Sequence, residues 1–284
     1  MTKKTNNKAM ITSIISNRYH VYYENEIVVA IAMGKLRLGE KPMVGDFVEL
    51  EWLDEQYVIQ KVLPRKNALK RPVVANVDQA LIVTSAKEPD FSFQLTDRLI
   101  FLVAYEGIEP VVVLSKADLL SEAEIAEIQD EYQKAGYQVV VTGKNDQAEG
   151  VYEILKDKTS VLAGQSGVGK SSILNRINPE FQIKTQQISK ALNRGKHTTR
   201  HNELFAMGGG WIADTPGFSS LDFSKLDPLR LAQSVPDFRA YADQCRFRDC
   251  LHINEPSCKI KEEVENGTIS KRRYCHYVEV IEQI

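Results

Sequence analysis

The segment from Gly164 to Ser171 constrains the fold of this chain more than any other. It reads Gly-Gln-Ser-Gly-Val-Gly-Lys-Ser, which fits G-x-x-x-x-G-K-[ST], and it lies between an apolar, strand-like run and a helix-like stretch. Glycines let successive backbone N–H groups turn inward around a phosphate, and the following helix adds its positive N-terminus. We expect Lys170 to reach the β- and γ-phosphates of a nucleotide and the Ser171 hydroxyl to meet Mg²⁺. The predicted phosphate-binding residues are Gly164, Gln165, Ser166, Gly167, Val168, Gly169, Lys170, Ser171 and Ser172.

Strand-like and helix-like stretches alternate around this segment. Apolar runs of strand length predict β-strands at Ala80–Val83, Val111–Leu114, Val139–Val141 and Val161–Ala163. Helical patterns predict helices at Leu95–Tyr105, Glu122–Ala135 and Gly150–Lys156. Two further strands, Asn202–Met207 and Trp211–Ala213, are expected after a short helix at Lys170–Ile177. This alternation is typical of an α/β fold with a doubly wound, mostly parallel sheet.

The two ends of the chain follow other patterns. Five short β-rich segments near the N-terminus predict a small barrel: Ile11–Ser16, Tyr19–Tyr23, Ile27–Ala32, Phe47–Trp52 and Tyr57–Val62. The basic, proline-ended stretch Asn67–Pro72 is expected to be a linker. After Leu221 the β pattern stops, and short helices around a Cys/His cluster are expected.

The stretch Ser115-Lys116-Ala117-Asp118 follows an apolar strand and resembles the guanine-reading element N-K-x-D. A carboxylate at Asp118 can accept hydrogen bonds from N1–H and the 2-amino group of guanine, which adenine lacks. The stem of Lys116 would pack beside the base. Ser115 or Asp118 is equally a candidate for the N-cap of the Glu-rich helix at Glu122–Ala135, so the sequence leaves two interpretations open.

A third motif, Asp214-Thr215-Pro216-Gly217, follows the apolar strand at Trp211–Ala213. This places the Asp214 carboxylate at the carboxyl end of a strand, where ligands bind in such sheets and where it can hold Mg²⁺ through water. The N–H of Gly217 can meet a γ-phosphate. The same four residues also make a good turn, which is the structural alternative.

The three motifs occur in an unusual order. In an ordinary GTPase the phosphate-binding segment comes first and the base-reading motif late, whereas here Asp118 precedes Gly164 and Asp214 comes last. A sheet can be cut and rejoined at the surface without moving its strand ends. The cyclic order therefore predicts a circularly permuted GTPase, with Val141–Lys144 as a candidate second loop against the base.

The polar stretch Arg194–Arg200 lies between the last two motifs and is either a switch or a mobile basic loop. In a switch, Thr198 or Thr199 would place its hydroxyl on Mg²⁺ and its N–H toward the γ-phosphate. Phe218 follows Gly217, near the place where Ras-like proteins carry a glutamine that orients the attacking water. Hydrolysis should therefore be slow without a partner, or another group must orient the water. The predicted catalytic residues are His197, Thr198, Thr199 and Lys170, although His197 is equally readable as a solvated loop residue.

Near the C-terminus, Cys245-x₄-Cys250-x-His252-x₅-Cys258 supplies three thiolates and one imidazole in a compact segment. Four nitrogen and sulfur ligands predict a closed, structural Zn²⁺ site, because no position is left for water. Unconnected buried cysteines are the alternative. The fourth cysteine, Cys275, is expected to be a packed thiol and not a fifth ligand.

Taken together, the barrel, the permuted motifs and the cysteine spacing resemble the bacterial RsgA (YjeQ/YloQ) family. The resemblance implies an OB-fold RNA-binding domain at 1–66, a circularly permuted GTPase domain at 67–222 and a zinc-binding domain at 223–284. It implies a GTPase that is stimulated by the small ribosomal subunit, assists late maturation of the 30S subunit, binds 16S rRNA and leaves after GTP hydrolysis. The implied cofactors are GTP, Mg²⁺ and one structural Zn²⁺ per chain. Ser115 stands where the family usually has Asn, so weaker contacts around the base are expected.

Two other functional classes stay open on the sequence. An ATP-using phosphotransferase would need neither Asp118 nor a switch threonine. A nucleotide-gated RNA-binding assembly factor would bind the nucleotide with little turnover of its own, and Phe218 is compatible with this alternative.

Composition and hydropathy restrict the partners and the cellular location that we expect for this chain. Its 284 residues carry 36 Lys+Arg against 38 Asp+Glu, so RNA binding would have to come from local basic patches. No apolar run approaches the roughly 20 residues that cross a bilayer, and the cysteines do not suggest a disulfide scaffold. We therefore expect a cytoplasmic monomer without a membrane partner.

Overall fold

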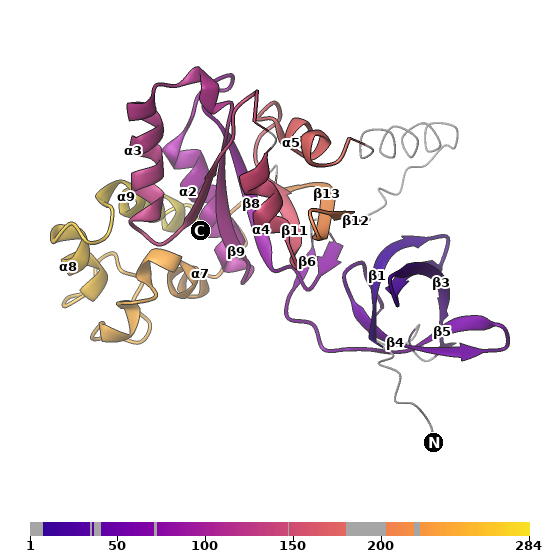
Figure 1. Ribbon diagram of the computed structural model, residues 1–284. Helices are drawn as coiled ribbons and strands as arrows, with labels where there is room; N and C mark the ends of the chain where they lie inside the picture. The colour runs from indigo at the N-terminus through magenta and orange to yellow at the C-terminus, as the bar shows by residue number, and fades with distance from the viewer. Residues whose placement is uncertain are drawn as a thin grey trace. The chain divides into compact units, whose positions relative to one another are not determined.

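The computed structural model describes residues 8–34, 36, 41–70, 73–146, 148–179, 203–218 and 222–284, without the side chains of 70 and 214–218 (Figure 1). The chain forms two compact units. The first comprises Met1–Asp78, Leu155–Val161 and Asn178–Pro216, and the second comprises Gln79–Ile154, Leu162–Ile177 and Gly217–Ile284. Among the described residues, no helix combines the length and the hydrophobicity that a membrane crossing requires.

A closed barrel of five strands in the order β1-β2-β3-β5-β4 forms the N-terminal part of the first unit. Its strands are β1 (Lys8–Ile15), β2 (Arg18–Tyr23), β3 (Glu26–Ala32), β4 (Phe47–Leu53) and β5 (Gln56–Val62). Three two-residue turns with positive φ at both positions suit the right-handed twist of the hairpins they close: Ser16-Asn17, Glu24-Asn25 and Asp54-Glu55. The order and the closure confirm the OB-type barrel expected from the sequence.

The stretch expected to be a linker after the barrel contains a small hairpin instead. Strands β6 (Ala68–Lys70) and β7 (Val73–Ala75) pair antiparallel. They do so because Leu69 and Val74 are buried, so the segment has apolar contacts of its own. The Asn67 side chain closes the hairpin with two hydrogen bonds to the backbone of Val77, at 2.7 and 2.8 Å.

A six-stranded sheet in the order β10-β9-β8-β11-β13-β12 confirms the α/β fold class. Its strands are β8 (Gln79–Ser85), β9 (Glu109–Ser115), β10 (Gln138–Val141), β11 (Thr159–Ala163), β12 (Leu204–Met207) and β13 (Gly210–Phe218). Strands β8, β9 and β10 are parallel, and β12 pairs antiparallel with β13. The side chains of β8 are buried along the whole strand, which explains why it reads as a continuous apolar run.

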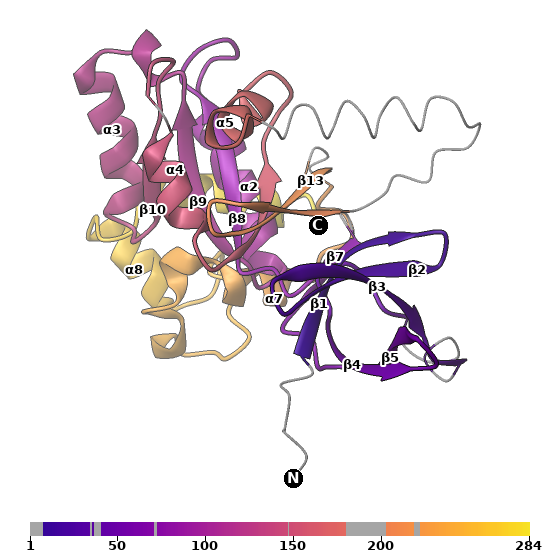
Figure 2. The ribbon, with the colours of Figure 1, turned by 45° about the vertical axis from the view of Figure 1, so that its right-hand side comes forward.

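The helices of the second unit lie against the sheet and against one another (Figures 1 and 2). Their bounds are α2 (Phe93–Tyr105), η1 (Ala117–Leu119), α3 (Glu122–Gln133), α4 (Glu149–Leu155) and α5 (Lys170–Ile177), followed by α7 (Pro228–Ser234), η2 (Pro236–Phe238), η3 (Ala242–Gln244), α8 (Lys259–Glu265) and α9 (Lys271–Ile281). Helix α2 packs on β8 and β9, α3 packs on β10, and both α7 and α9 contact α2. The C-terminal helices are therefore attached to the helical layer of the α/β sheet.

A buried ionic cluster ties α9 to the rest of the unit. The Arg273 guanidinium donates to Asp237 at 2.8 Å and to the Glu131 carbonyl at 2.6 Å, and the Tyr137 hydroxyl donates to Asp237 as well. Only 3% of the Arg273 side chain and 4% of the Asp237 side chain are exposed. Because a charge without its partner is costly at such a depth, α9 is strongly specified in this position.

We predict that Asp237→Ala lowers the free energy of unfolding by about 3–5 kcal/mol, because it leaves the Arg273 charge buried without its main partner. Urea denaturation measures the change. The matched variant Asp130→Ala removes the ion pair between Asp130 and Lys134. The side chains of these two residues are 63% and 76% exposed, respectively. This control should cost only about 0.3–0.5 kcal/mol. Equal effects of the two variants would contradict the prediction.

Candidate functional site

The loop between β11 and α5 has the backbone that a phosphate cradle requires. Gly164, Gly167 and Gly169 have φ values of +133°, +84° and +93°, which residues with a side chain rarely adopt. A Cβ on Gly164 would lie 2.2 Å from the Val83 carbonyl oxygen, so no other residue fits at that position without moving β8 or the loop. The glycines of the motif therefore serve both the turn of the loop and its close approach to β8.

Helix α5 begins at the end of this loop with Lys170. The Lys170 ammonium donates to the carbonyls of Gly164 and Gln165, at 2.8 and 2.5 Å, and so lies across the loop. Ser171 and Ser172 in the first turn are exposed. The N-terminus of α5, the Lys170 charge and the serine hydroxyls thus lie together at one end of the loop, and such groups can bind an anion.

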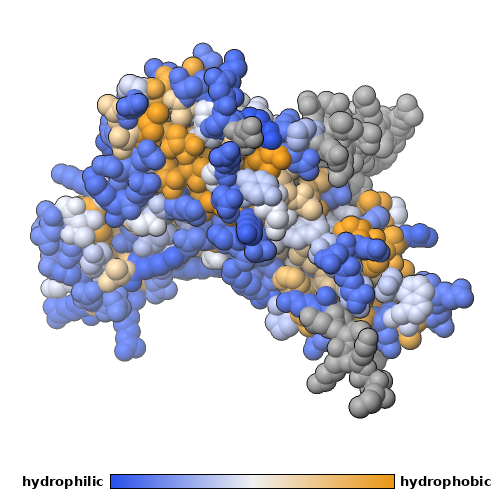
Figure 3. All heavy atoms as spheres, viewed as in Figure 1, coloured by the Kyte–Doolittle hydropathy of each residue, from blue (hydrophilic) through white to orange (hydrophobic). Residues whose placement is uncertain are grey.

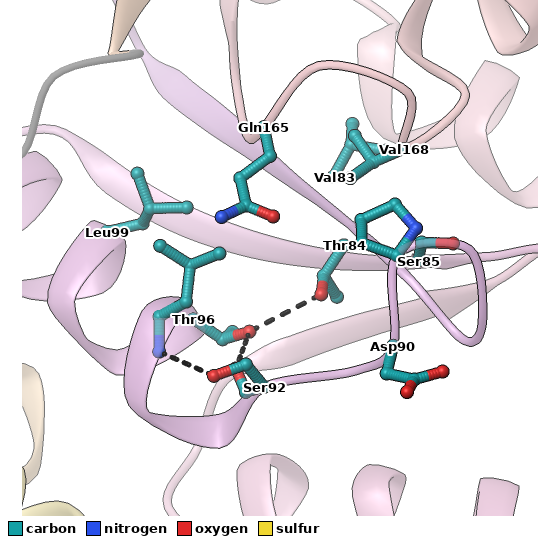
Figure 4. Close-up of a pocket in the computed structure, with 11 residues that line it drawn as sticks. Val83, Thr84, Ser85, Asp90, Ser92, Thr96, Leu99, Gln165 and Val168 are labelled. Atoms are coloured by element: carbon teal, nitrogen blue, oxygen red, sulfur yellow. Dashed lines mark hydrogen bonds between the residues drawn. The ribbon is translucent and has the colours of Figure 1, made fainter.

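A small pocket lies between the loop and the start of α2 (Figure 4). Gln165 and Val168 of the loop line it together with Ser92 and Thr96, and the Thr96 hydroxyl donates to the Ser92 carbonyl at 2.9 Å. Its volume of about 10 Å³ leaves room for one water at most. This space is a packing gap and not the ligand site.

Ser115, at the end of β9, joins the base-reading stretch to the phosphate loop. The residue is 2% exposed, and its hydroxyl lies 2.5 Å from the Val168 carbonyl oxygen and 3.1 Å from that of Thr84. The short side chain thus keeps a direct contact with the loop although it differs from the usual Asn. Lys116 follows with a left-handed backbone (φ +54°) and donates to the Glu88 carbonyl.

Asp118 meets the loop that was expected to be the second base contact. Its Oδ1 accepts the Lys144 N–H at 2.7 Å, and a Cβ on Gly143 would lie 3.3 Å from the same oxygen. The alternative in which Ser115 or Asp118 caps the following helix is wrong. Ser121 caps α3 in a capping box with Glu124, so the carboxylate of Asp118 is not used for that purpose.

One cavity brings these parts together. Its volume is about 370 Å³, within the range of small-ligand pockets. It is lined by Ser115, Lys116, Asp118, Leu119, Gly143, Lys144, Gly169, Ser172, Ile173 and Arg176. The base-reading stretch, the Gly143-Lys144 loop and the start of α5 therefore face a single space.

A clasp that the sequence analysis missed lies at the base end of this cavity. Arg176 of α5 contacts Asp146, Nη1 to Oδ1 at 3.0 Å, and also donates to the Gly143 carbonyl. Burial opposes ionisation of Asp146, but hydrogen bonds from Thr142 and two backbone N–H groups, with the Arg176 charge, outweigh it and lower its pKa. No periodicity or motif links residues so far apart in the chain.

The other residues predicted for the nucleotide site lie partly or wholly outside the residues that the structure describes. The sequence predicted that the Asp-Thr-Pro-Gly motif follows the strand. Strand β13 instead continues to Phe218, so the motif lies within the last part of the strand. The side chain of Asp214 is not described. His197, Thr198 and Thr199 lie outside the described residues.

The three cysteines and the histidine of the C-terminal motif converge. The ligand atoms of Cys245, Cys250, His252 and Cys258 all lie within 4.8 Å of one another. The Cys245–Cys258 sulfur distance is 4.0 Å, and His252 Nδ1 lies 3.6 and 3.5 Å from the same two sulfurs. A tetrahedron with Zn–S of about 2.3 Å and Zn–N of about 2.0–2.1 Å has edges of about 3.8 and 3.5 Å. The cluster thus fits Zn²⁺.

Helix α9 holds the backbone of this cluster. The hydroxyls of Tyr274 and Tyr277 donate to the carbonyls of His252 and Leu251, at 2.7 and 2.9 Å. Burial raises the pKa of Cys250 to about 12 and lowers that of His252 to about 4, so without a metal this thiol stays protonated and this imidazole stays neutral. A divalent cation would displace the thiol protons and supply the charge that the site lacks. Cys275 lies outside the cluster and is exposed, so the prediction of a packed thiol is wrong.

Comparison with known proteins identifies the family. The family model described as RsgA GTPase matches residues 62–224, more than half of the chain. A relative from Listeria monocytogenes serotype 4b (strain F2365), named small ribosomal subunit biogenesis GTPase RsgA 1, is 43% identical over 283 residues, 98% of this chain and 97% of the relative.

The chain belongs to the RsgA GTPase family. It is accordingly a GTPase, a hydrolase that uses GTP and Mg²⁺. Among solved structures, YloQ, a circularly permuted GTPase, has a TM-score of 0.83 and 36% identity, with 100% of this chain and 97% of that chain covered. YjeQ from Thermotoga maritima has the same TM-score and identity, with 98% of both chains covered. These likenesses confirm the permuted order of the RsgA fold in this chain.

We predict that Ser115→Ala weakens binding of GTP and GDP by about 2- to 12-fold, the worth of one hydrogen bond, because the Val168 carbonyl loses its donor. Fluorescent-nucleotide titration measures both affinities. Ser234→Ala is the matched control, since it removes a 2.9 Å bond from a hydroxyl to the Leu231 carbonyl in α7. Unchanged affinity in Ser115→Ala would show that the contact has no role in binding.

We also predict that Cys258→Ser abolishes binding of one zinc ion per chain and lowers the thermal unfolding midpoint, because the remaining ligands cannot close a tetrahedron. Metal analysis of the purified protein and a thermal scan measure these effects. Cys275→Ser should keep both the zinc and the midpoint. Zinc retained by Cys258→Ser would exclude this ligand set.

Proposed function

We propose that this chain is a GTPase stimulated by the small ribosomal subunit, which assists late 30S maturation and leaves after hydrolysis. The observation that carries the proposal is the cavity that unites Asp118 and the phosphate loop, in a chain whose relatives are named small ribosomal subunit biogenesis GTPases. Because its partner would be a ribosomal particle, we place its work in the cytoplasm, as a monomer.

The roles we assign follow from the chemistry of the motifs. Lys170 and the loop N–H groups hold the β- and γ-phosphates, and Asp118 with Lys116 holds guanine. Ser171, Asp214 and Thr198 or Thr199 would hold Mg²⁺, and the ion would neutralise charge on the phosphates when bound. The Gly217 N–H contacts the γ-phosphate. His197 orients the attacking water, since Phe218 has no polar group for this task.

The ends of the chain offer surfaces for 16S rRNA. On the barrel, the Trp52 side chain is 59% exposed beside Tyr57, and the Lys8 ammonium lies 4.0 Å from the centre of the Phe47 ring. Near the metal cluster, the Arg246 guanidinium lies 5.4 Å from the centre of the exposed Phe247 ring. Aromatic and basic side chains together suit stacked bases and a phosphate backbone. Figure 3 shows hydrophobic areas on this face over the α/β part and over the barrel, amid a hydrophilic surface.

A nucleotide-gated RNA-binding factor with little turnover of its own is the second candidate. Phe218 favours it, because a ring cannot orient water. In this case the barrel and the zinc-binding segment would do the work, and the nucleotide would control binding only. The two candidates differ in whether the ribosomal subunit raises the rate of hydrolysis.

We expect 30S subunits to raise GTP turnover by at least tenfold, a barrier change of about 1.4 kcal/mol, because binding to the subunit would bring His197 into position to orient the water. The measurement is phosphate release with 30S subunits, with 50S subunits and with ATP in place of GTP. Asp118→Asn should lose the 30S-stimulated GTP reaction and its preference for guanine. No stimulation, with RNA binding intact, would favour the second candidate.

A further inference from the structure

We propose that Asp146 and Arg176 form a clasp that positions the guanine-reading carboxylate of Asp118, and so sets base specificity from outside the base contacts themselves. The inference rests on the proposed function, because it assigns Asp118 to guanine. Neither residue belongs to the motifs that identify the nucleotide site. Both are positioning residues, since they act on the base through the Thr142–Lys144 backbone.

The Asp146 carboxylate closes the loop on itself. Oδ1 accepts the Thr142 hydroxyl at 2.7 Å and the Ala148 N–H at 2.8 Å, and Oδ2 accepts the Gly143 N–H at 2.5 Å. A carboxylate can take all three bonds because each oxygen has two acceptor positions. One side chain therefore holds the Thr142 hydroxyl and the backbone N–H groups of Gly143 and Ala148.

Arg176 braces the closed loop from α5. Besides its contact with Oδ1, its guanidinium donates to the carbonyls of Gly143 and Asp146 and to the Thr142 hydroxyl, the last at 3.2 Å. Arg176 lies six residues after Lys170 on the same helix, a rise of about 9 Å. A rigid helix thus links the phosphate-binding lysine to the loop at the base end of the cavity.

The closed loop in turn orients Asp118. The Lys144 N–H, one residue after the Gly143 N–H held by Asp146, donates to Asp118 Oδ1 at 2.7 Å. Within the described part of the chain no partner is recorded for Asp118 Oδ2. Each carboxylate oxygen therefore keeps acceptor capacity for N1–H and the 2-amino group of guanine. If the loop moves, the carboxylate loses the bond that fixes its direction.

The Asp146–Arg176 ion pair is too exposed to contribute much to the free energy of unfolding of the whole unit. The Arg176 and Asp146 side chains are 26% and 41% exposed, and ion pairs of this exposure contribute little to folding. Loss of the clasp should therefore disorder the base loop while the rest of the unit stays folded. Strong effects on base recognition with small effects on unfolding distinguish a positioning role from a structural one.

The test compares Asp146→Asn and Arg176→Met with the wild type in binding fluorescent GTP and GDP, and in competition by ITP, which lacks the 2-amino group, and by ATP. We expect both variants to weaken GTP and GDP binding by the same factor, at least about tenfold, the lower limit for one hydrogen bond to a charged group. The preference for GTP over ITP should fall by a similar factor. The kcat of the 30S-stimulated reaction at saturating GTP should not change.

Several controls keep the outcome decisive. Asp130→Asn removes an exposed ion pair on α3 and should leave affinity and preference at wild-type values. The double variant should be no weaker than either single variant, because the two side chains act as one unit. Arg176→Lys, which keeps the charge but not the planar fork, should show a smaller loss in the same direction and serves if the other variants do not fold.

The experiment distinguishes rejection of the clasp hypothesis from rejection of the proposed function. A wild-type protein that binds ATP or ITP as well as GTP would overturn the role of Asp118 and the clasp with it. A wild-type protein that prefers GTP, with variants that keep the same GTP-to-ITP ratio, would overturn the clasp alone.

Discussion

The close approach of the phosphate loop to strand β8 is the constraint on which the site depends. Gly164 can lie against the Val83 carbonyl only because it has no side chain, and this contact sets where the loop turns and where α5 begins. The buried Ser115 hydroxyl then links the same loop, through Val168, to the end of β9. Since β9 leads into Lys116 and Asp118, two parallel strands and one loop define both ends of the cavity that we propose for the nucleotide.

This dependence explains why the chain order can be permuted without loss of the site. A nucleotide meets strand ends, loops and one helix N-terminus, and these are held by sheet pairing and by contacts such as that of Asp118 with Lys144. None of these interactions requires that the phosphate loop be synthesised first. The RsgA fold uses that freedom, and the α/β sheet here is preceded by a barrel and followed by a metal-binding segment.

The C-terminal segment belongs to the second unit for a physical reason. A short stretch of chain with few apolar residues cannot build a core of its own. It is held instead by four converging metal ligands, by two tyrosines of α9 and by the buried Arg273–Asp237 pair. Helix α9 also packs on α2, whose first turn lines the small pocket beside the phosphate loop.

The elements and motifs of this chain could be predicted from the sequence because they depend on local physics. Short β-rich segments between polar turns predicted the strands of the barrel, glycines at fixed spacing predicted the phosphate loop, and cysteine spacing predicted the metal cluster. The cap of α3 by Ser121 is a capping box with Glu124, a local pattern that the sequence itself carries. Tertiary structure alone decided that the expected linker is a hairpin and that Cys275 is exposed. It also created the clasp of Asp146 and Arg176, whose geometry arises only when β10 and α5 come together. Hydrogen bonds between residues distant in sequence leave no periodic pattern, and for that reason only the folded chain reveals them.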